Sequence, residues 1–122
     1  MSKRIERLFS NLAKRQEKAL ITYLMAGDPD LDTSLALMDQ LVYAGADILE
    51  VGFPFSEPMA DGPIIQAASM RSLRQGTTLF DVLHVVHRFR QRQAETPVVL
   101  MGYLNPIMRL GEVMFAQRAA QA

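Results

Sequence analysis

Three short apolar segments, separated by stretches long enough to form helices, constrain the fold of this chain most. They span residues 19–25, 47–53 and 97–101, and turn-forming residues lie close to them. Short apolar runs of this kind are typical of buried strands. Strands that alternate with helical crossovers predict βαβ units and a parallel sheet, either closed as a barrel or open and doubly wound. A dinucleotide-binding fold would need G-x-G-x-x-G after the first strand, whereas residues 26–29 read AGDP.

Apolar periodicity and end signals predict the helices between these strands. Expected helices run over about residues 3–16, from 32 to about 44, from 61 to about 75, from 78 through 89, and from 112 to 122. Asp30 or Asp32 is expected to cap the second of them. Thr78 and Asp81 resemble a capping box, with Asp in place of the usual Glu. The basic stretch at residues 88–92, RFRQR, is interpreted as a solvated helix face.

Composition narrows the class of protein. The 122 residues carry 13 Lys and Arg against 13 Asp and Glu, so zero net charge gives no long-range attraction to nucleic acid or an anionic membrane. No cysteine is present, which excludes a disulfide, a thiolate nucleophile and a sulfur-ligated zinc site. The apolar run at residues 19–26 is too short to cross a bilayer, so a cytoplasmic protein is expected. No nearby Asp or Cys completes a site with His84 and His87, and no metal is predicted.

Glu50 stands in the middle of the second predicted strand. Side chains alternate across a strand, so Glu50 lies on one face and the apolar Leu49 and Val51 on the other. If the apolar pair packs on helices, Glu50 points into a barrel near the carboxyl end of its strand, where barrel enzymes carry their chemistry. A carboxyl group so poorly solvated can donate and accept a proton near neutral pH. In the alternative, Glu50 faces outward and pairs with a helix Lys or Arg.

Asp61 is the second candidate carboxylate, in the loop that follows the same strand. Asp61, Gly62 and Pro63 together predict a helix start, with Asp61 as the N-cap and Pro63 in the first turn. A structural cap and a functional carboxylate are both open at this stage. The two roles are compatible, because one carboxylate oxygen can cap the helix while the other faces a ligand.

The run at residues 49–63, LEVGFPFSEPMADGP, resembles the signature of the tryptophan synthase alpha subunit family. Three flanking pieces agree with it: YLMAGDP at 23–29, AGAD at 44–47 and MGYLNP at 101–106. The resemblance covers essentially the whole chain. It implies a (β/α)8 TIM barrel that cleaves indole-3-glycerol phosphate to indole and glyceraldehyde 3-phosphate by a retro-aldol reaction in tryptophan biosynthesis.

The resemblance also implies roles for individual residues. Glu50 corresponds to the family's acid/base glutamate, and Asp61 to its aspartate near the indole nitrogen. Tyr23, Leu100 and Tyr103 are expected to line the indole pocket. The loop over residues 53–60 is implied to contact a beta subunit in an alpha2-beta2 assembly, with this interface formed by Pro54, Phe55, Ser56, Glu57 and Pro58. Pyridoxal phosphate is expected in that partner, and no cofactor is expected in this chain.

The chain departs from the family in length and at one interface position. Many members carry Asp where this chain has Glu57, which keeps the charge and lengthens the side chain. A complete barrel needs about 250 residues, so residues 1–122 are interpreted as one partial barrel domain with three parallel strands after an N-terminal helix. Strands four to eight, and the phosphate-binding loops among them, are absent, so the chain alone is expected to be inactive. The alternative is a non-catalytic fragment that only binds the beta subunit.

Overall fold

The computed structural model describes residues 2–122, which form three strands and six helices. In chain order they are α1 (Lys3–Arg15), β1 (Ile21–Met25), α2 (Leu31–Tyr43), β2 (Ile48–Gly52), α3 (Pro63–Arg74), α4 (Leu79–Arg90), β3 (Val98–Met101), α5 (Leu104–Leu110) and α6 (Glu112–Gln121). The three predicted strands are confirmed, each within its predicted segment.

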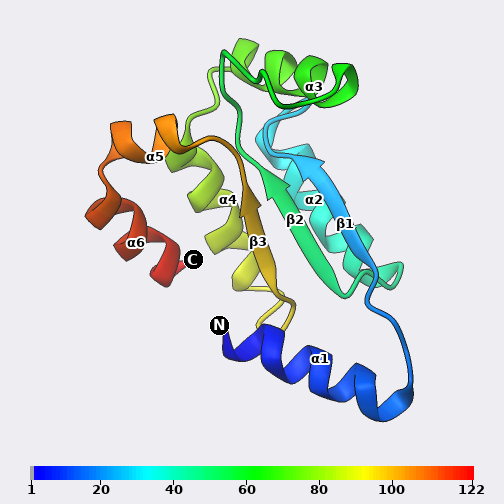
Figure 1. Ribbon diagram of the computed structural model, residues 1–122. Coiled ribbons are helices and arrows are strands. Elements are labelled where there is room, and N and C mark those ends of the chain that lie inside the picture. Colours follow the sequence, from blue (N-terminus) through cyan, green and yellow to red (C-terminus); the bar gives the residue numbers. More distant parts are fainter. Residues whose placement is uncertain (1) are drawn as a thin grey trace.

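The strands form one parallel sheet in the order β1-β2-β3. Helices α2 and α4 lie together behind this sheet and cover one of its faces (Figure 1). Helix α1 crosses below the amino ends of the strands, α3 lies beyond their carboxyl ends, and α5 and α6 pack beside α4 (Figure 1). The second face of the sheet carries no helix among residues 2–122.

The hydrophobic core lies between the sheet and its helical layer. Leu49 and Val51 of β2 are fully buried, and they belong to one cluster with Met38 of α2 and with Val82 and Phe89 of α4. Residues at alternate positions of a strand point to the same side. The other face of β2, which includes Glu50, therefore points away from α2 and α4.

The predicted helix ends are largely confirmed. The Asp30 carboxylate accepts a hydrogen bond from the Thr33 backbone N–H at 2.7 Å and so caps α2. Thr78 and Asp81 form the reciprocal capping box that starts α4. Short helix α5 was not predicted. Its third residue is Pro106, which the first turn tolerates because backbone N–H groups there have no intrahelical acceptor.

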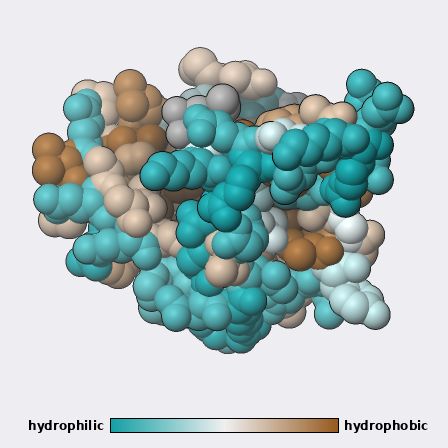
Figure 2. Space-filling view, turned by 90° about the horizontal axis from the view of Figure 1, so that it is seen from below, coloured by the Kyte–Doolittle hydropathy of each residue, from teal (hydrophilic) through white to brown (hydrophobic). Residues whose placement is uncertain are grey.

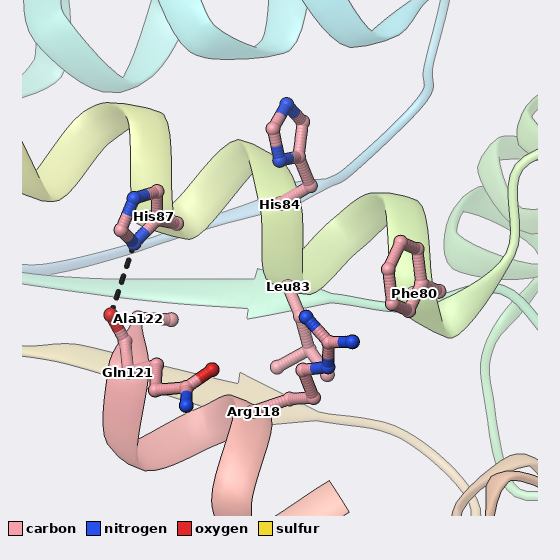
Figure 3. A pocket seen from close by; sticks show the side chains of 7 residues that line it. All are labelled: Phe80, Leu83, His84, His87, Arg118, Gln121 and Ala122. Atoms are coloured by element: carbon pink, nitrogen blue, oxygen red, sulfur yellow. Dashed lines mark hydrogen bonds between the residues drawn. The ribbon is translucent and has the colours of Figure 1, made fainter.

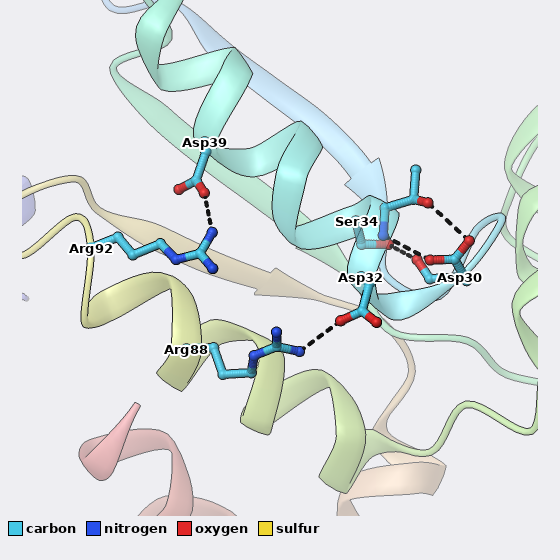
Figure 4. A network of polar contacts seen from close by, with 7 residues as sticks. Asp30, Asp32, Ser34, Asp39, Arg88 and Arg92 are labelled. Carbon is cyan, nitrogen blue, oxygen red and sulfur yellow. Dashed lines mark hydrogen bonds and ion pairs between the residues drawn. The ribbon is translucent and has the colours of Figure 1, made fainter.

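Arginines in and just after α4 form ion pairs with α2, an addition to the interpretation of residues 88–92 as a solvated helix face. Arg88 pairs with Asp32 at 2.9 Å, and Arg92 pairs with Asp39 (Figure 4). Arg90 is half-buried and donates to the backbone carbonyl groups of residues 93, 94 and 96. The basic stretch thus bridges α4 and α2 at the surface and binds the loop before β3.

Figure 2 shows the molecule from the end where α1 lies. This face is mainly hydrophilic, whereas hydrophobic residues gather on the side of α5 and α6. Large apolar side chains exposed on these two helices are Leu104, Met108, Val113 and Met114. Within residues 2–122, no helix combines the length and apolar character that crossing a membrane requires.

Candidate functional site

Glu50 occupies the middle of the sheet face that α2 and α4 leave uncovered. The strand register pairs it with Tyr23 on β1 and Val99 on β3, so these three side chains form a row on that face. The Glu50 side chain is half-buried. It forms no ion pair or hydrogen bond with any residue from 2 to 122, so the alternative of an outward carboxylate held by a helix Lys or Arg is not what the structure shows.

Tyr23 links Glu50 to the second carboxylate. Its ring lies over Gly52, where a Cβ atom would overlap the phenol. The hydroxyl oxygen is buried and finds no partner among the described residues. Burial raises the pKa of Tyr23 to about 12, and the negative charges of Asp61 and then Glu50 contribute to the same shift. Both predicted catalytic carboxylates therefore contribute to the electrostatic environment of this hydroxyl.

Asp61 does not cap α3, which corrects the expectation that it is the N-cap. Gly62 is the N-cap residue, with extended backbone at φ −74° and ψ 170°, and no side chain caps the helix. Pro63 takes the first helical position, which shifts the cap one residue past Asp61. The Asp61 carboxylate consequently stays outside the hydrogen bonds of the helix end and is half-buried.

The loop between β2 and α3 is held at several points around Asp61. The Asp61 N–H donates to the Pro58 carbonyl at 3.0 Å, and Gln66 Nε2 donates to the Asp61 carbonyl at 2.8 Å. The Ala60 N–H donates to the Tyr103 hydroxyl at 2.8 Å. These bonds reach the loop from α3 and from the end of β3. They define the backbone on both sides of the Asp61 side chain.

A second restraint on the loop lies at Phe55. The Ser69 hydroxyl of α3 accepts a hydrogen bond from the Phe55 N–H at 3.1 Å and donates to the Phe55 carbonyl at 3.0 Å. The Phe55 ring packs on the Tyr103 ring, with centroids 5.3 Å apart. Ser69 is almost fully buried. Sequence reasoning missed Ser69 and Gln66, because a polar residue on a helix carries no signal of the loop that it will contact.

The other predicted pocket residues divide between the two faces of the sheet. Tyr103 follows β3 and contacts the Asp61 loop, as described above. Leu100 pairs in register with Val51 and packs against the core, so the structure does not bring it to the Glu50 face. Met101, its neighbour, pairs with Gly52 and lies on that face. Alternation along a strand makes such an assignment sensitive to a shift of one residue.

The segment predicted to contact a partner borders a groove at the carboxyl end of the sheet. Pro54, Phe55 and Ser56 line this groove, which has a volume of about 700 Å³. Asn105 and Arg109 of α5 line its opposite side. The remaining two predicted interface residues, Glu57 and Pro58, do not line it, and the Glu57 side chain is exposed.

A separate pocket of about 300 Å³ lies between α4 and α6, and it includes neither carboxylate (Figure 3). His87 Nδ1 contacts the backbone oxygen of Gln121 at 2.9 Å, whereas His84 points away from Arg118 (Figure 3). Nowhere in residues 2–122 do three or more His, Asp or Glu residues gather closely enough to hold a metal ion.

Known proteins resemble this chain over nearly its whole length. Residues 9–122 match the family model described as tryptophan synthase alpha chain. The tryptophan synthase alpha chain of Alkalilimnicola ehrlichii is 57% identical over 119 residues, which are 98% of this chain and 43% of that relative. That of Neisseria gonorrhoeae is 61% identical over 105 residues, 86% of this chain and 40% of the relative. The chain thus spans less than half the length of these curated relatives.

Solved structures agree with the fold. Tryptophan synthase subunit alpha from Legionella pneumophila matches with a TM-score of 0.96 and 47% identity, over 99% of this chain and 46% of that one. A tryptophan synthase structure from Mycobacterium tuberculosis, in an aminoacrylate-bound form, matches with a TM-score of 0.89 and 39% identity, over 98% of this chain and 48% of that one. The predicted fold class is confirmed: the three parallel strands and their helices form the N-terminal part of a (β/α)8 barrel.

Proposed function

Because this chain belongs to the tryptophan synthase alpha chain family, we propose that it carries the acid/base groups that cleave indole-3-glycerol phosphate to indole and glyceraldehyde 3-phosphate. The observation that supports this proposal most is the arrangement of Glu50 and Asp61. Glu50 lies beside Tyr23 on the sheet face that α2 and α4 leave uncovered, Asp61 lies in the loop that follows the same strand, and neither carboxylate is used in an ion pair within residues 2–122. Barrel enzymes place their chemistry at the carboxyl ends of their strands.

Glu50 is the group that moves protons in the proposed reaction. Breaking the bond between indole C3 and the glycerol chain requires C3 to become tetrahedral, so Glu50 in its acid form protonates C3. The glycerol hydroxyl then loses its proton to the Glu50 carboxylate while the C–C bond breaks and the aldehyde forms. The bonding electrons return to the ring, indole leaves, and Glu50 ends in the form in which it began.

Asp61 is the group that stabilises charge. Protonation at C3 spreads positive charge to the ring N–H, and a fixed carboxylate lowers the energy of that state. Because α3 does not use this carboxylate as a cap, both of its oxygens remain for the substrate. Tyr23, Tyr103 and Met101 lie on or beside the same face and would bound the indole ring.

The groove beside Pro54, Phe55 and Ser56 is the proposed contact with a tryptophan synthase beta chain. Its lining combines apolar side chains with Asn105 and Arg109, a mixture common at interfaces between proteins. In this proposal the pyridoxal phosphate is bound by the partner, and the reaction in this chain uses carboxyl groups alone. The assembly is proposed to work in the cytoplasm.

Two substitutions, each made in the full protein that the gene encodes, test the catalytic roles of Glu50 and Asp61. We expect Glu50→Gln to lower the rate of indole release by about two to four orders of magnitude, because the amide cannot transfer protons. Asp61→Asn should lower it by about 100-fold through loss of charge stabilisation. Indole release is measured from indole-3-glycerol phosphate, and thermal unfolding of each variant is measured alongside. Normal turnover by Glu50→Gln would refute the assignment.

A binding-only role is the second candidate, and the groove described above favours it as a separate function. Co-purification with the beta chain, without any indole release from the unaltered protein, would support binding alone. Charge reversal at the groove, Arg109→Glu, is expected to weaken co-purification while leaving the thermal unfolding temperature unchanged, because this side chain is exposed. Equal co-purification of both proteins would exclude this groove as the contact.

A further inference from the structure

Tyr103 stands where β3 ends and α5 begins, and its hydroxyl is not used by either element. It is the N-cap residue of α5 by position, yet its side chain makes no capping bond. Its ring instead packs on Phe55, 5.3 Å between centroids and tilted by 32°. This contact places the hydroxyl beside the loop that carries Asp61.

The Tyr103 hydroxyl accepts a hydrogen bond from the Ala60 N–H at 2.8 Å. Ala60 immediately precedes Asp61, so this bond fixes the residue before the carboxylate. The carbonyl of Asp61 itself is held by Gln66 at 2.8 Å. The Asp61 side chain forms no hydrogen bond or ion pair with residues 2–122. Tyr103 and Gln66 thus restrain the backbone from which the Asp61 side chain extends, one at the preceding residue and the other at the Asp61 carbonyl.

We propose that Tyr103 is a positioning residue for Asp61, which it holds at the indole N–H through the backbone of Ala60. This role rests on the proposed function, since it needs Asp61 to act on the substrate. It differs from a simple lining role, in which the Tyr103 ring would only bound the indole. Charge stabilisation depends steeply on the placement of the charged group. Loss of the hydroxyl should thus affect the transition state more than substrate binding.

The first test is Tyr103→Phe in the protein as its gene encodes it, in complex with its beta partner. Phe keeps the ring that packs on Phe55 and removes only the hydroxyl. Loss of one neutral hydrogen bond should lower kcat by about fivefold to tenfold. The KM for indole-3-glycerol phosphate should stay within about twofold of the value for the unaltered protein. Tyr43→Phe is the matched control, because Tyr43 is 89% exposed on α2 and lies in no part of the site. Its kcat should equal that of the unaltered protein.

The second test repeats the substitution in an Asp61→Asn background, with single-turnover measurements of indole release. If Tyr103 acts through the Asp61 charge, Tyr103→Phe should then lower the rate by less than about twofold. A fall in the rate of about fivefold to tenfold in the Asp61→Asn background would overturn the proposal. A role of Tyr103 in packing or in direct substrate contact does not need the Asp61 charge, so it would give the same fall in both backgrounds. An increase in KM with kcat unchanged would overturn it as well.

The two proposals fail in different ways. If the unaltered protein releases no indole, the proposed function is wrong and the positioning role falls with it. If the unaltered protein and Tyr43→Phe are active and Tyr103→Phe matches them in kcat, only the positioning role is wrong. Thermal unfolding of Tyr103→Phe within a few degrees of the unaltered protein excludes a loss of fold as the cause of a lower kcat.

Discussion

Gly52 shows how a single missing side chain shapes this site. The Tyr23 phenol occupies the space that a Cβ atom at position 52 would need. We expect Gly52→Ala to lower the free energy of unfolding by about 1–3 kcal/mol, a range typical of forced overpacking. Urea unfolding measures this change. In a Tyr23→Ala background the same substitution should cost much less; an equal cost there would show that the ring is not what excludes the methyl group.

The ionisation of Tyr23 gives a second prediction for a single residue. Its pKa of about 12 lies above the usual 10.0, because burial and two nearby carboxylates disfavour the phenolate. The folded chain therefore holds this proton where the unfolded chain has lost it, so stability should fall as pH rises from 10 toward 12. Urea unfolding across that range should show a shallower fall for Tyr23→Phe. Identical slopes for both proteins would contradict the shift.

The residues of the site differed in how well sequence could place them. Strand alternation placed Glu50 correctly, because Leu49 and Val51 on either side are apolar and need the helices. The expected lining role of Leu100 came from the resemblance and not from alternation, whereas in the structure Leu100 pairs with Val51 and packs against the core. The prediction that Asp61 is the N-cap of α3 was wrong for another reason. Pro63 is the first residue of the helix, which makes Gly62 the cap, and local propensity alone does not distinguish between two adjacent cap positions.

At the scale of elements, α3 anchors two loops through two buried serines, one turn apart. Ser69 holds both backbone groups of Phe55, and Ser72 donates to the Ala26 carbonyl at 2.6 Å. We expect Ser69→Ala to speed hydrogen exchange at the Phe55 amide by about tenfold, since its acceptor is removed. Ser72→Ala is the matched control and should leave Phe55 exchange unchanged. Equal acceleration by both would mean that α3 loosens as a whole.

Helix boundaries were predicted correctly where residues close in the sequence determine them. The starts of α2 and α4 were predicted correctly from Asp30, Thr78 and Asp81. The side chains of these residues form hydrogen bonds with backbone groups only three residues away. Helix α5 was missed, since a proline within seven residues argues against a helix unless the first turn is recognised. The contacts of Arg88 and Arg92 with α2 join residues more than 50 positions apart, which no local pattern contains.

At the scale of the whole molecule, the described sheet has one face without helices. Val99 is 40% exposed on that face. We expect residues 1–122, expressed alone, to associate as concentration rises, because exposed apolar strands favour pairing. Light scattering should show less association for Val99→Lys. Leu37→Lys is the control, since Leu37 is 43% exposed on α2, away from the sheet. Equal effects of the two substitutions would show that the uncovered face does not drive association.

The start of α3 has a consequence for how the chemistry of this chain can change. Its first turn is specified by the extended backbone of Gly62 and by the ring of Pro63, and by no charged side chain. The Asp61 side chain, next to this turn, forms no capping hydrogen bond with the helix that it precedes. We therefore expect that a different side chain at position 61 breaks no capping bond of α3, so the reactivity of this position can change while the start of the helix stays as it is.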